Sequence, residues 1–505
     1  IRRCSARQTA STHPRRTSIL QGPDLVVAHD VKAALLENLD RAVGVLHADH
    51  DEGVVGALFD ESVDVFDVHP VFTQRLEHAV EPAGTVLEGH AVAVADGRIQ
   101  AVLALDEARA RFQSSVLVER PDHVLIPGLI NTHTHAAMTL FRGLADDLPL
   151  EKWLREDIWP AERRWVSAEM VRDGTQLAIA EMLRGGITCF ADQYFFPEIV
   201  AEAATDLAMR AVVATPVVDF PSAWAQNIDE YLQKAADLVH DPYANHPLIT
   251  TAFAPHSTFA LADRSLEALR VLADQLDVRV QMHLHESAAE VETSLRETGM
   301  RPFERVAKAG LVNSSLLAVH AVHMNEDEIE RFAEVGVNIA HCPKSNLKLA
   351  SGVARVADYR EAGVNVALGT DGAASNNTLD LFAEMQAAAL LAKVSAADAA
   401  AVPASEALHM ATLAGARALG LEERIGSIET GKQADLACVD LGALNSQPVY
   451  DVVSQLVYAA NSSQVSDVWV SGRHQLDNGR FTHIDSDNLV ARSNEWRDRI
   501  AMTGA

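Results

Sequence analysis

The chain has 505 residues, 48% of them hydrophobic, which is enough to bury a large core in one catalytic domain with a smaller companion. Its formal net charge of −28 argues against binding a nucleic acid, because contacts to phosphate require clustered Lys and Arg. Its four cysteines form no Cys-x-x-Cys pair, and no run approaches the roughly 18 apolar residues of a membrane-spanning helix. We therefore expect a cytoplasmic protein that acts on a small molecule and has neither a nucleic acid nor a membrane as partner.

Residues 1–65 begin without Met and open with a basic, polar stretch. Their low aromatic content and mixed charge suit partial disorder, so we interpret them as an N-terminal extension. From residue 66 the pattern becomes that of β-strands. Residues 92–95 and 99–102 flank Asp96 and Gly97, a hairpin turn that favours positive φ at Gly97. We expect residues 66–127 to form the first part of a small β-sandwich.

The middle of the chain, residues 128–420, alternates short apolar strands with helical segments, which is typical of βα units and a parallel sheet. We predict eight strands, at residues 124–130, 187–191, 211–214, 248–253, 278–282, 316–319, 337–340 and 364–368. Eight such units over roughly 300 residues favour a TIM (β/α)8 barrel, which places catalytic groups at the C-terminal ends of its strands. A helical segment with Trp153 and Glu162 follows the first strand, where it could form a wall over the mouth of the barrel.

Strand patterns return near the other end of the chain, at residues 434–439 and 467–472. We expect residues 421–485 to complete the sandwich, and residues 486–505 to form a C-terminal helix. The predicted fold class is therefore α/β: a TIM barrel with a small discontinuous β-sandwich built from both ends of the chain.

Four residues at the ends of predicted strands could bind one metal ion. His133 and His135 are two positions apart, so in a strand both imidazoles face the same way. His283 and Asp371 end two other strands and offer a third nitrogen and a carboxylate. Such donors suit zinc, or iron, better than calcium or magnesium. Each residue taken singly also fits a structural role, such as a core histidine or a helix cap, but their combination predicts a site for a single ion.

Two further residues could move protons at this site. Glu286, three residues after His283, can take a proton from a metal-activated water and pass it to a ring nitrogen of the substrate. Its alternative role is that of a first-turn glutamate at the positive end of the next helix. His320 follows the strand at 316–319 and could hydrogen-bond the attacking hydroxide. Packing or structural hydrogen bonding is expected of the other polar residues near the strand ends, His285, His323, His341 and Asp192.

Four motifs carry a family resemblance: residues 128–135 read GLINTHTH, 283–286 read HLHE, 318–320 read AVH and 368–377 read LGTDGAASNN. Together they resemble the amidohydrolase superfamily, and most of all its branch of 5-methylthioadenosine/S-adenosylhomocysteine deaminases. The resemblance implies one zinc ion per subunit, and water that displaces the amino group of an adenine ring. The substrate would be 5-methylthioadenosine, S-adenosylhomocysteine or adenosine, and the products the inosine analogue and ammonia. Homo-oligomers are common in this family, so a homo-oligomer is expected.

The resemblance also implies roles for residues around the ion, which would be held by residues matching His133, His135, His283 and Asp371. Glu286 would contact the substrate and carry a proton to its ring nitrogen. His320 would orient hydroxide, and Asp371 would help to pass the last proton to the departing ammonia.

Three more residues are implied to contact the nucleoside: Glu162 and His256 would bind ribose hydroxyls, and Trp153 would line the pocket. Without the resemblance they fit a helix-surface carboxylate, a turn histidine and a packing tryptophan.

One departure from the family pattern concerns substrate specificity. Some relatives hold the homocysteine carboxylate with arginines between the third and fourth strands, but residues 211–263 contain no arginine, and Lys234 is their only lysine. We therefore expect 5-methylthioadenosine or adenosine to be turned over better than S-adenosylhomocysteine.

Two other interpretations stay open. The alternative function is another aminohydrolase of the same architecture, such as a guanine, 8-oxoguanine or triazine-processing enzyme. A free base has no ribose diol, so Glu162→Ala should barely change its binding. The other interpretation is a non-catalytic scaffold that kept the barrel and lost its metal, which metal analysis of the purified protein would decide.

Overall fold

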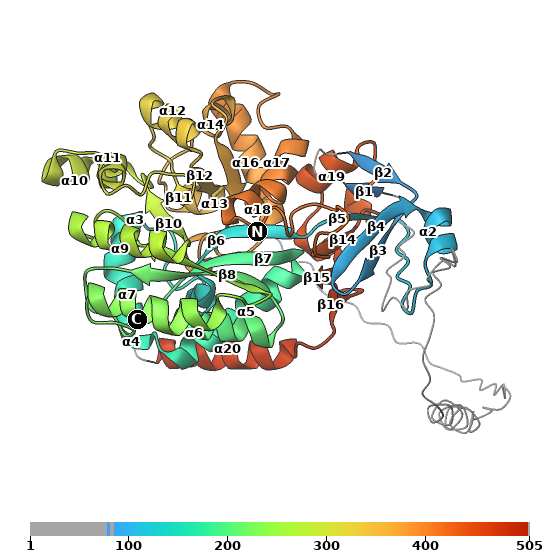
Figure 1. Cartoon of the computed structure of the whole chain (residues 1–505), viewed down its shortest axis with the longest axis horizontal. Helices are drawn as coiled ribbons and strands as arrows, with labels where there is room; N and C mark the ends of the chain where they lie inside the picture. Colours follow the sequence, from blue (N-terminus) through green and yellow to red (C-terminus); the bar gives the residue numbers. More distant parts are fainter. Residues whose placement is uncertain (1–77, 81–84, 503–505) are drawn as a thin grey trace, which may run out of the picture. The chain divides into compact units, whose positions relative to one another are not determined.

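The computed structural model of the chain describes residues 78–80 and 85–502. The predicted extension over residues 1–65 and part of the predicted sandwich segment, residues 66–77 and 81–84, lie outside the described residues. The described residues belong to one compact unit, shown in Figure 1.

Eight parallel strands form a nearly closed barrel, in the order β13-β12-β11-β10-β9-β8-β7-β6. Their bounds are β6 Leu129–Thr134, β7 Ile187–Gln193, β8 Arg210–Val217, β9 Ile249–Pro255, β10 Arg279–Leu284, β11 Leu316–His320, β12 Asn338–His341 and β13 Asn365–Leu368. At the seam, Thr132 Oγ1 donates to the carbonyl of Leu368 at 2.8 Å, and Asp371 N donates to the carbonyl of His133 at 3.0 Å. The predicted TIM barrel is confirmed.

The first predicted strand, residues 124–130, is wrong as a single element. The structure divides it into β5 His123–Pro127 and β6, which belong to different sheets. The division falls at Gly128, where a Cβ atom would lie 2.1 Å from Thr188 Oγ1, so the backbone passes too close for any side chain. Both strands are buried throughout except at His123, and an unbroken apolar run hides such a break.

The second sheet joins the two ends of the described chain, in the order β17-β16-β15-β14-β5-β1-β2. Its remaining strands are β1 His78–Val80, β2 Val86–Glu88, β14 Leu436–Asp440, β15 Val465–Val470, β16 Arg473–Asp477 and β17 Arg480–Phe481. The hairpin of β3 His90–Ala95 and β4 Arg98–Ala104 forms a separate two-stranded sheet. Its turn has φ of 75° at Gly97, which confirms the predicted positive φ there, and φ of 51° at Asp96. Figure 1 shows blue N-terminal strands beside red C-terminal ones.

A buried ion pair ties the barrel to the second sheet. Arg210 on β8 donates to both carboxylate oxygens of Asp435, at 2.8 and 2.9 Å. The backbone N–H of Ser471 donates to the same carboxylate at 2.7 Å. Removing one partner of such a pair would leave an unpaired buried charge, so the two parts of the fold are strongly coupled.

The α-helices of the described residues are α2 Leu105–Arg111, α3 Leu150–Lys152, α4 Trp159–Trp165, α5 Ala168–Arg184, α6 Pro197–Asp206, α7 Ile228–Lys234, α8 Asp241–Tyr243, α9 Asp263–Leu276, α10 Ala288–Thr298, α11 Pro302–Lys308, α12 Glu326–Val335, α13 Pro343–Lys348, α14 Val356–Glu361, α15 Ala373–Asn376, α16 Leu381–Ala396, α17 Ala404–Met410, α18 Leu413–Leu419, α19 Val452–Tyr458 and α20 Ser486–Ala501. They lie around the barrel, except α2, which follows β4 and packs against the hairpin of β3 and β4. A π-helical turn, η2 Trp153–Ile158, joins α3 to α4 in the connection after β6. None of the helices in the described part of the chain combines the length and the apolar composition that a membrane crossing requires.

Candidate metal centre and active site

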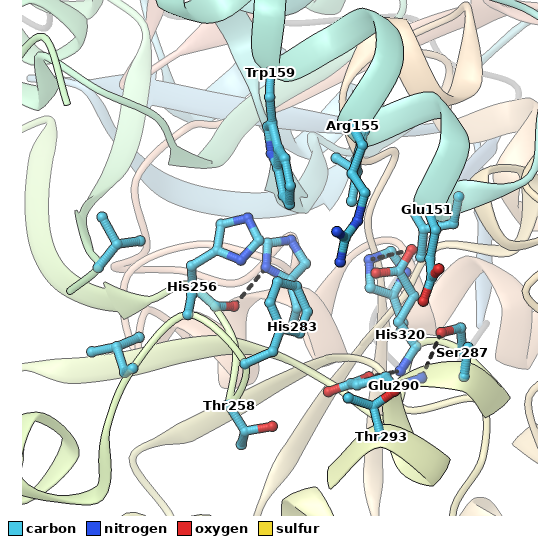
Figure 2. A pocket seen from close by; sticks show the side chains of 18 of the residues that line it. Glu151, Arg155, Trp159, His256, Thr258, His283, Ser287, Glu290, Thr293 and His320 are labelled. Carbon is cyan, nitrogen blue, oxygen red and sulfur yellow. Dashed lines mark hydrogen bonds and ion pairs between the residues drawn. The ribbon is translucent and has the colours of Figure 1, made fainter. Parts of the chain in front are cut away.

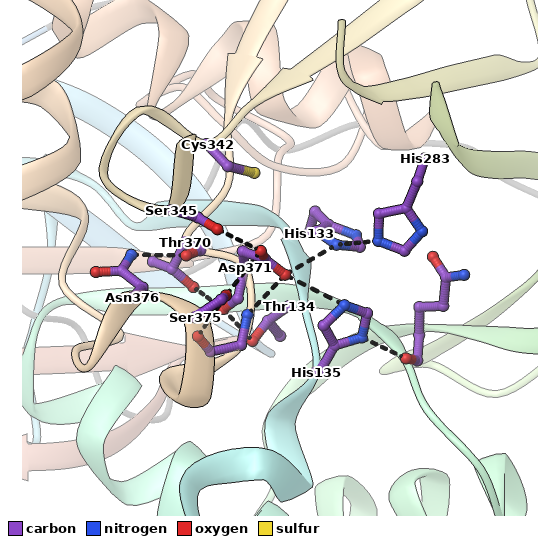
Figure 3. Close-up of polar contacts among 12 residues, drawn as sticks. His133, Thr134, His135, His283, Cys342, Ser345, Thr370, Asp371, Ser375 and Asn376 are labelled. Atoms are coloured by element: carbon purple, nitrogen blue, oxygen red, sulfur yellow. Dashed lines mark hydrogen bonds and ion pairs between the residues drawn. The ribbon is translucent and has the colours of Figure 1, made fainter. Parts of the chain in front are cut away.

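The four predicted metal ligands meet at the C-terminal rim of the barrel (Figure 3). One donor atom from each of His133, His135, His283 and Asp371 lies within 4.8 Å of the others. The Nε2 atoms of His133 and His283 are 3.2 Å apart. Asp371 Oδ1 lies 3.4 Å from Nε2 of His133 and 3.2 Å from Nε2 of His135. Strands β6, β10 and β13 thus direct three imidazoles and one carboxylate to a common point.

Hydrogen bonds on the far side of the ligands fix their orientation. Nδ1 of His135 donates to the carbonyl of Gln193 at 2.6 Å, and Nδ1 of His283 donates to the carbonyl of His256 at 2.8 Å. Because a carbonyl can only accept, each ring carries its proton on Nδ1 and leaves Nε2 free for an ion. Asp371 Oδ2 is held in turn by two hydroxyl groups, those of Ser345 at 2.6 Å and Ser375 at 2.8 Å.

Electrostatics at the cluster also fit a cation. Burial lowers the pKa of His133 to about 4 and that of His283 well below its usual value, so both rings are neutral. Burial opposes the charged form of His135 too, but the hydrogen bond to Asp371, the negative charge of Asp371 and the hydrogen bond to the Gln193 carbonyl together outweigh burial and raise the pKa of His135 to about 9. The carboxylate of Asp371 thus favours a positive charge at this point. Three imidazole nitrogens with one carboxylate are the donor set of a zinc-type site rather than a calcium or magnesium site.

The predicted proton-transfer residues lie beside this cluster. Glu286 Oε1 is 3.9 Å from Nε2 of His320, whose Nδ1 lies 2.9 Å from Oδ1 of Asn346. Burial raises the pKa of Glu286, although His320 opposes the shift. His320 and Asp371 adopt left-handed backbone conformations, with φ of 69° and 60°. Such conformations are costly for residues other than glycine, and strained residues of this kind cluster at functional sites.

A cavity of about 1060 Å³ opens above the cluster and is lined by Glu286, Trp153, Glu162 and His256 among others. Figure 2 shows His256, His283 and His320 in a row, with Arg155 and Trp159 reaching toward them from the wall formed after β6. The cavity is at the upper end of the size range of small-molecule sites. The structure thus brings every residue predicted for substrate contact to the same cavity.

Several residues of the site were not predicted from the sequence. The buried Tyr194 donates from its hydroxyl to Glu162 Oε1 at 2.8 Å, and no local pattern marks it. Ser375 follows Asp371 by one helical turn within the fourth motif, so it could have been found from spacing. Residues 211–263 contain no arginine, but the cavity does have arginines in its lining. Arg155, Arg296 and Arg305 line it from other elements.

The structural roles predicted for two neighbouring residues are confirmed. Asp192 Oδ1 accepts the backbone N–H of Ala136 at 2.6 Å, directly after the ligand His135. His285 Nε2 accepts the backbone N–H of Phe303 at 2.9 Å, pointing away from the ligands. Both side chains hold backbone near the site.

A TIM barrel with this ligand set at its C-terminal rim and a buried glutamate beside it defines a metal-dependent hydrolase. The family comparison is more specific. Residues 124–474 match the model of the Amidohydrolase family, and the chain belongs to this family. The predicted resemblance is therefore confirmed.

Named relatives and solved structures agree with this assignment. The chain is 46% identical over 421 residues to a 5-methylthioadenosine/S-adenosylhomocysteine deaminase of Teredinibacter turnerae, covering 83% of this chain and 95% of that one. It resembles the crystal structure of a Xanthomonas campestris adenosine deaminase with bound zinc, with a TM-score of 0.85, 50% identity and coverage of 86% and 99%. An atrazine chlorohydrolase of Arthrobacter aurescens complexed with zinc is similar at 26% identity, with a TM-score of 0.79 and coverage of 84% and 99%. The chain is a metal-dependent hydrolase of C–N bonds that catalyses hydrolytic deamination.

Proposed function

We propose that the substrate is an adenosine-type nucleoside, 5-methylthioadenosine, adenosine or S-adenosylhomocysteine, and that one zinc ion per subunit serves the reaction. The observation that carries the proposal is the place of Glu162 and His256 in the same cavity as the ligands and Glu286. A carboxylate can accept two hydrogen bonds from a vicinal diol, which a nucleoside has and a free base lacks. The names of the Teredinibacter and Xanthomonas proteins support the same substrate class.

His133, His135, His283 and Asp371 would hold the zinc ion. When bound, the zinc ion would lower the pKa of a water molecule and so make that water nucleophilic at neutral pH. Glu286 takes one proton from the attacking water and delivers it to the ring nitrogen beside the amino-bearing carbon. The raised pKa of Glu286 suits it to hold this proton between the two transfers.

The remaining steps use His320 and Asp371. His320, oriented through Nδ1 by Asn346, directs Nε2 to the nucleophile and stabilises it by a hydrogen bond. The water oxygen bonds to the ring carbon, the C–N bond breaks, and Asp371 passes the second proton of water to the departing amino group. The products are ammonia and the inosine analogue.

Nucleoside contacts come from the wall after β6 and from the loop after β9. Tyr194 keeps the Glu162 carboxylate oriented, at 2.8 Å, so that its other oxygen can accept from the ribose. His256 directly follows β9, and its imidazole lines the same cavity. Trp153, only 5% exposed, gives the pocket an apolar wall for the substrate.

Among the three nucleosides we propose that 5-methylthioadenosine or adenosine is preferred, because residues 211–263 contain no arginine to clamp a carboxylate. Arg155 and Arg296 line the cavity from other elements, so the preference has to be measured. Comparable kcat/KM values for all three nucleosides would contradict it.

A panel assay of ammonia release tests the whole proposal. We expect turnover of the three nucleosides and none of guanine, 8-oxoguanine, cytosine or a triazine, with zinc rather than iron in the purified protein. Glu162→Ala should raise KM for the nucleosides, whereas in a free-base enzyme it would leave KM unchanged. Turnover of a free base in preference to every nucleoside would establish the alternative function.

Assembly into a homo-oligomer stays a prediction, which light scattering can test.

A further inference from the structure

Glu290 lies one helical turn after Glu286, in the first turn of α10. Ser287 is the N-cap of this helix, and its hydroxyl oxygen accepts the N–H of Glu290 at 3.1 Å. In a capping box the glutamate at this position accepts the N–H of the N-cap residue in return. Here Glu290 Oε2 accepts the N–H of Glu286 at 2.8 Å, one residue before the N-cap. The first turn of α10 therefore holds the backbone of the residue proposed to transfer protons.

The surroundings of Glu290 differ from those of an ordinary helix cap. Its Oε1 is buried and has no hydrogen-bond partner among the described residues. Glu290 also lines the cavity that Glu286 lines, and Figure 2 shows it below His320 and beside Ser287. Burial, together with the nearby Glu286, raises the pKa of Glu290 to about 8. Glu290 therefore faces the same cavity as the residue whose backbone N–H it accepts.

Glu286 depends on its backbone for its position. It follows β10 by two residues and precedes α10 by two, so it belongs to neither element. On one side the chain is fixed by His285, whose ring accepts the N–H of Phe303 at 2.9 Å. On the other side, Glu290 provides the hydrogen bond to Glu286 itself. A displacement of about 1 Å in a reacting group can lower a rate by about a hundredfold.

We propose that Glu290 is a positioning residue for the reaction: its carboxyl group accepts the N–H of Glu286 and so keeps the Glu286 carboxylate beside His320 and the substrate ring. This inference rests on the proposed role of Glu286. It assigns Glu290 no contact with the substrate.

Steady-state kinetics of the full, zinc-loaded chain with adenosine test this role. We expect Glu290→Ala to lower kcat by about ten- to a hundredfold, with KM changed by less than about twofold and zinc content unchanged. Glu290→Gln offers an amide oxygen that can accept the same N–H, so we expect it to keep kcat within about threefold of the starting protein. Glu267→Ala, at an exposed position on α9, is the matched control and should leave kcat and KM unchanged.

Two results would overturn the inference: unchanged kcat in Glu290→Ala, or equal losses in Glu290→Ala and Glu290→Gln. If the alanine variant does not fold, Glu290→Asp replaces it, because a side chain shorter by one methylene cannot reach the same N–H; unchanged kcat there also overturns the inference. Glu286→Gln is measured in parallel. Full activity of that variant would refute the proposed function of Glu286, whereas an inactive Glu286→Gln beside a fully active Glu290→Ala would refute only the positioning role.

Discussion

The side chain of His135 is already oriented for metal binding in the structure. Its Nδ1 is committed to the carbonyl of Gln193, and its Nε2 lies 3.2 Å from Asp371 Oδ1. A cation bound at Nε2 would displace any proton between the two groups, because metal binding releases protons from its ligands.

Replacing this ligand should remove the metal. Loss of a partner behind a ligand already weakens metal binding by about ten- to a hundredfold, so we expect His135→Ala to lower zinc affinity by more than about a hundredfold. Zinc content after dialysis and kcat should fall together. His123→Ala, a half-buried strand residue in the second sheet, is the control. Full zinc content in His135→Ala would show that the ion is bound elsewhere.

Tyr194 is a second single residue whose contacts predict a measurable effect. Its ring centroid is 6.3 Å from that of His135, and its hydroxyl donates to Glu162, so one buried side chain links the metal centre to the residue proposed to bind ribose. Hydrogen bonds to charged groups contribute about 1.5–3 kcal/mol. We therefore expect Tyr194→Phe to lower kcat/KM for adenosine by about tenfold or more.

The effect should depend on the sugar. For 2′,3′-dideoxyadenosine, which lacks both hydroxyls, Tyr194→Phe should change kcat/KM by less than about threefold. Tyr450→Phe, which alters a residue that is 93% exposed, should change neither value. An equal loss with both nucleosides would mean that Tyr194 supports the fold of the site and not ribose recognition.

At the scale of secondary structure, the sequence predicts the barrel well because each strand is a short apolar run between turn residues. It does not predict the break between β5 and β6. Gly128 is required there only because Thr188 of the neighbouring strand passes so close, and that contact exists only in the folded sheet. The same limit applies to the site. His133 and His135 can be predicted from their spacing in the sequence. Tyr194 and Glu290 cannot, because the residues that they contact are brought beside them only by the fold.

The second sheet contains an ion-pair network whose effect on stability should depend on pH. Burial alone would raise the pKa of Asp467 on β15, but hydrogen bonds from His474 and Arg120 outweigh it and lower the pKa to about 2. In an unfolded chain an aspartate has a pKa of about 3.9. The stabilisation by ionised Asp467 is therefore fully present above about pH 4 and is lost as the pH falls through about 2.

Asp467→Asn should accordingly lower the free energy of unfolding at pH 7 by about 2 kcal/mol. The difference from the starting protein should narrow between pH 5 and pH 3, and urea unfolding at several pH values measures it. Asp477→Asn alters a carboxylate that is 56% exposed and should cost less than about 1 kcal/mol. A difference that stays constant down to pH 3 would mean that Asp467 acts through packing and not through its charge.

At the scale of the whole molecule, the catalytic unit is assembled from residues far apart in the sequence. The C-terminal helix α20 returns to the barrel, where Trp496 Nε1 donates to Asp173 on α5 at 2.8 Å. The second sheet joins strands from residues 78–127 to strands from residues 436–481. Both ends of the described chain are therefore part of one cooperative structure with the barrel.

The first 65 residues can be tested separately from this structure. All residues proposed for catalysis and binding lie between 133 and 371, and the Teredinibacter relative is matched over 95% of its length by 421 residues of this chain. We therefore expect deletion of residues 1–65 to leave kcat/KM and zinc content within about twofold, because the barrel and its ligands are untouched. Deletion of residues 1–95 should behave differently, since it removes β3 and with it Val92 and Val94, which pack in the core beside Trp469. The loss of these core residues should lower the unfolding temperature measurably. For the shorter deletion, a loss of activity would contradict our expectation and show that residues 1–65 contribute to the working enzyme.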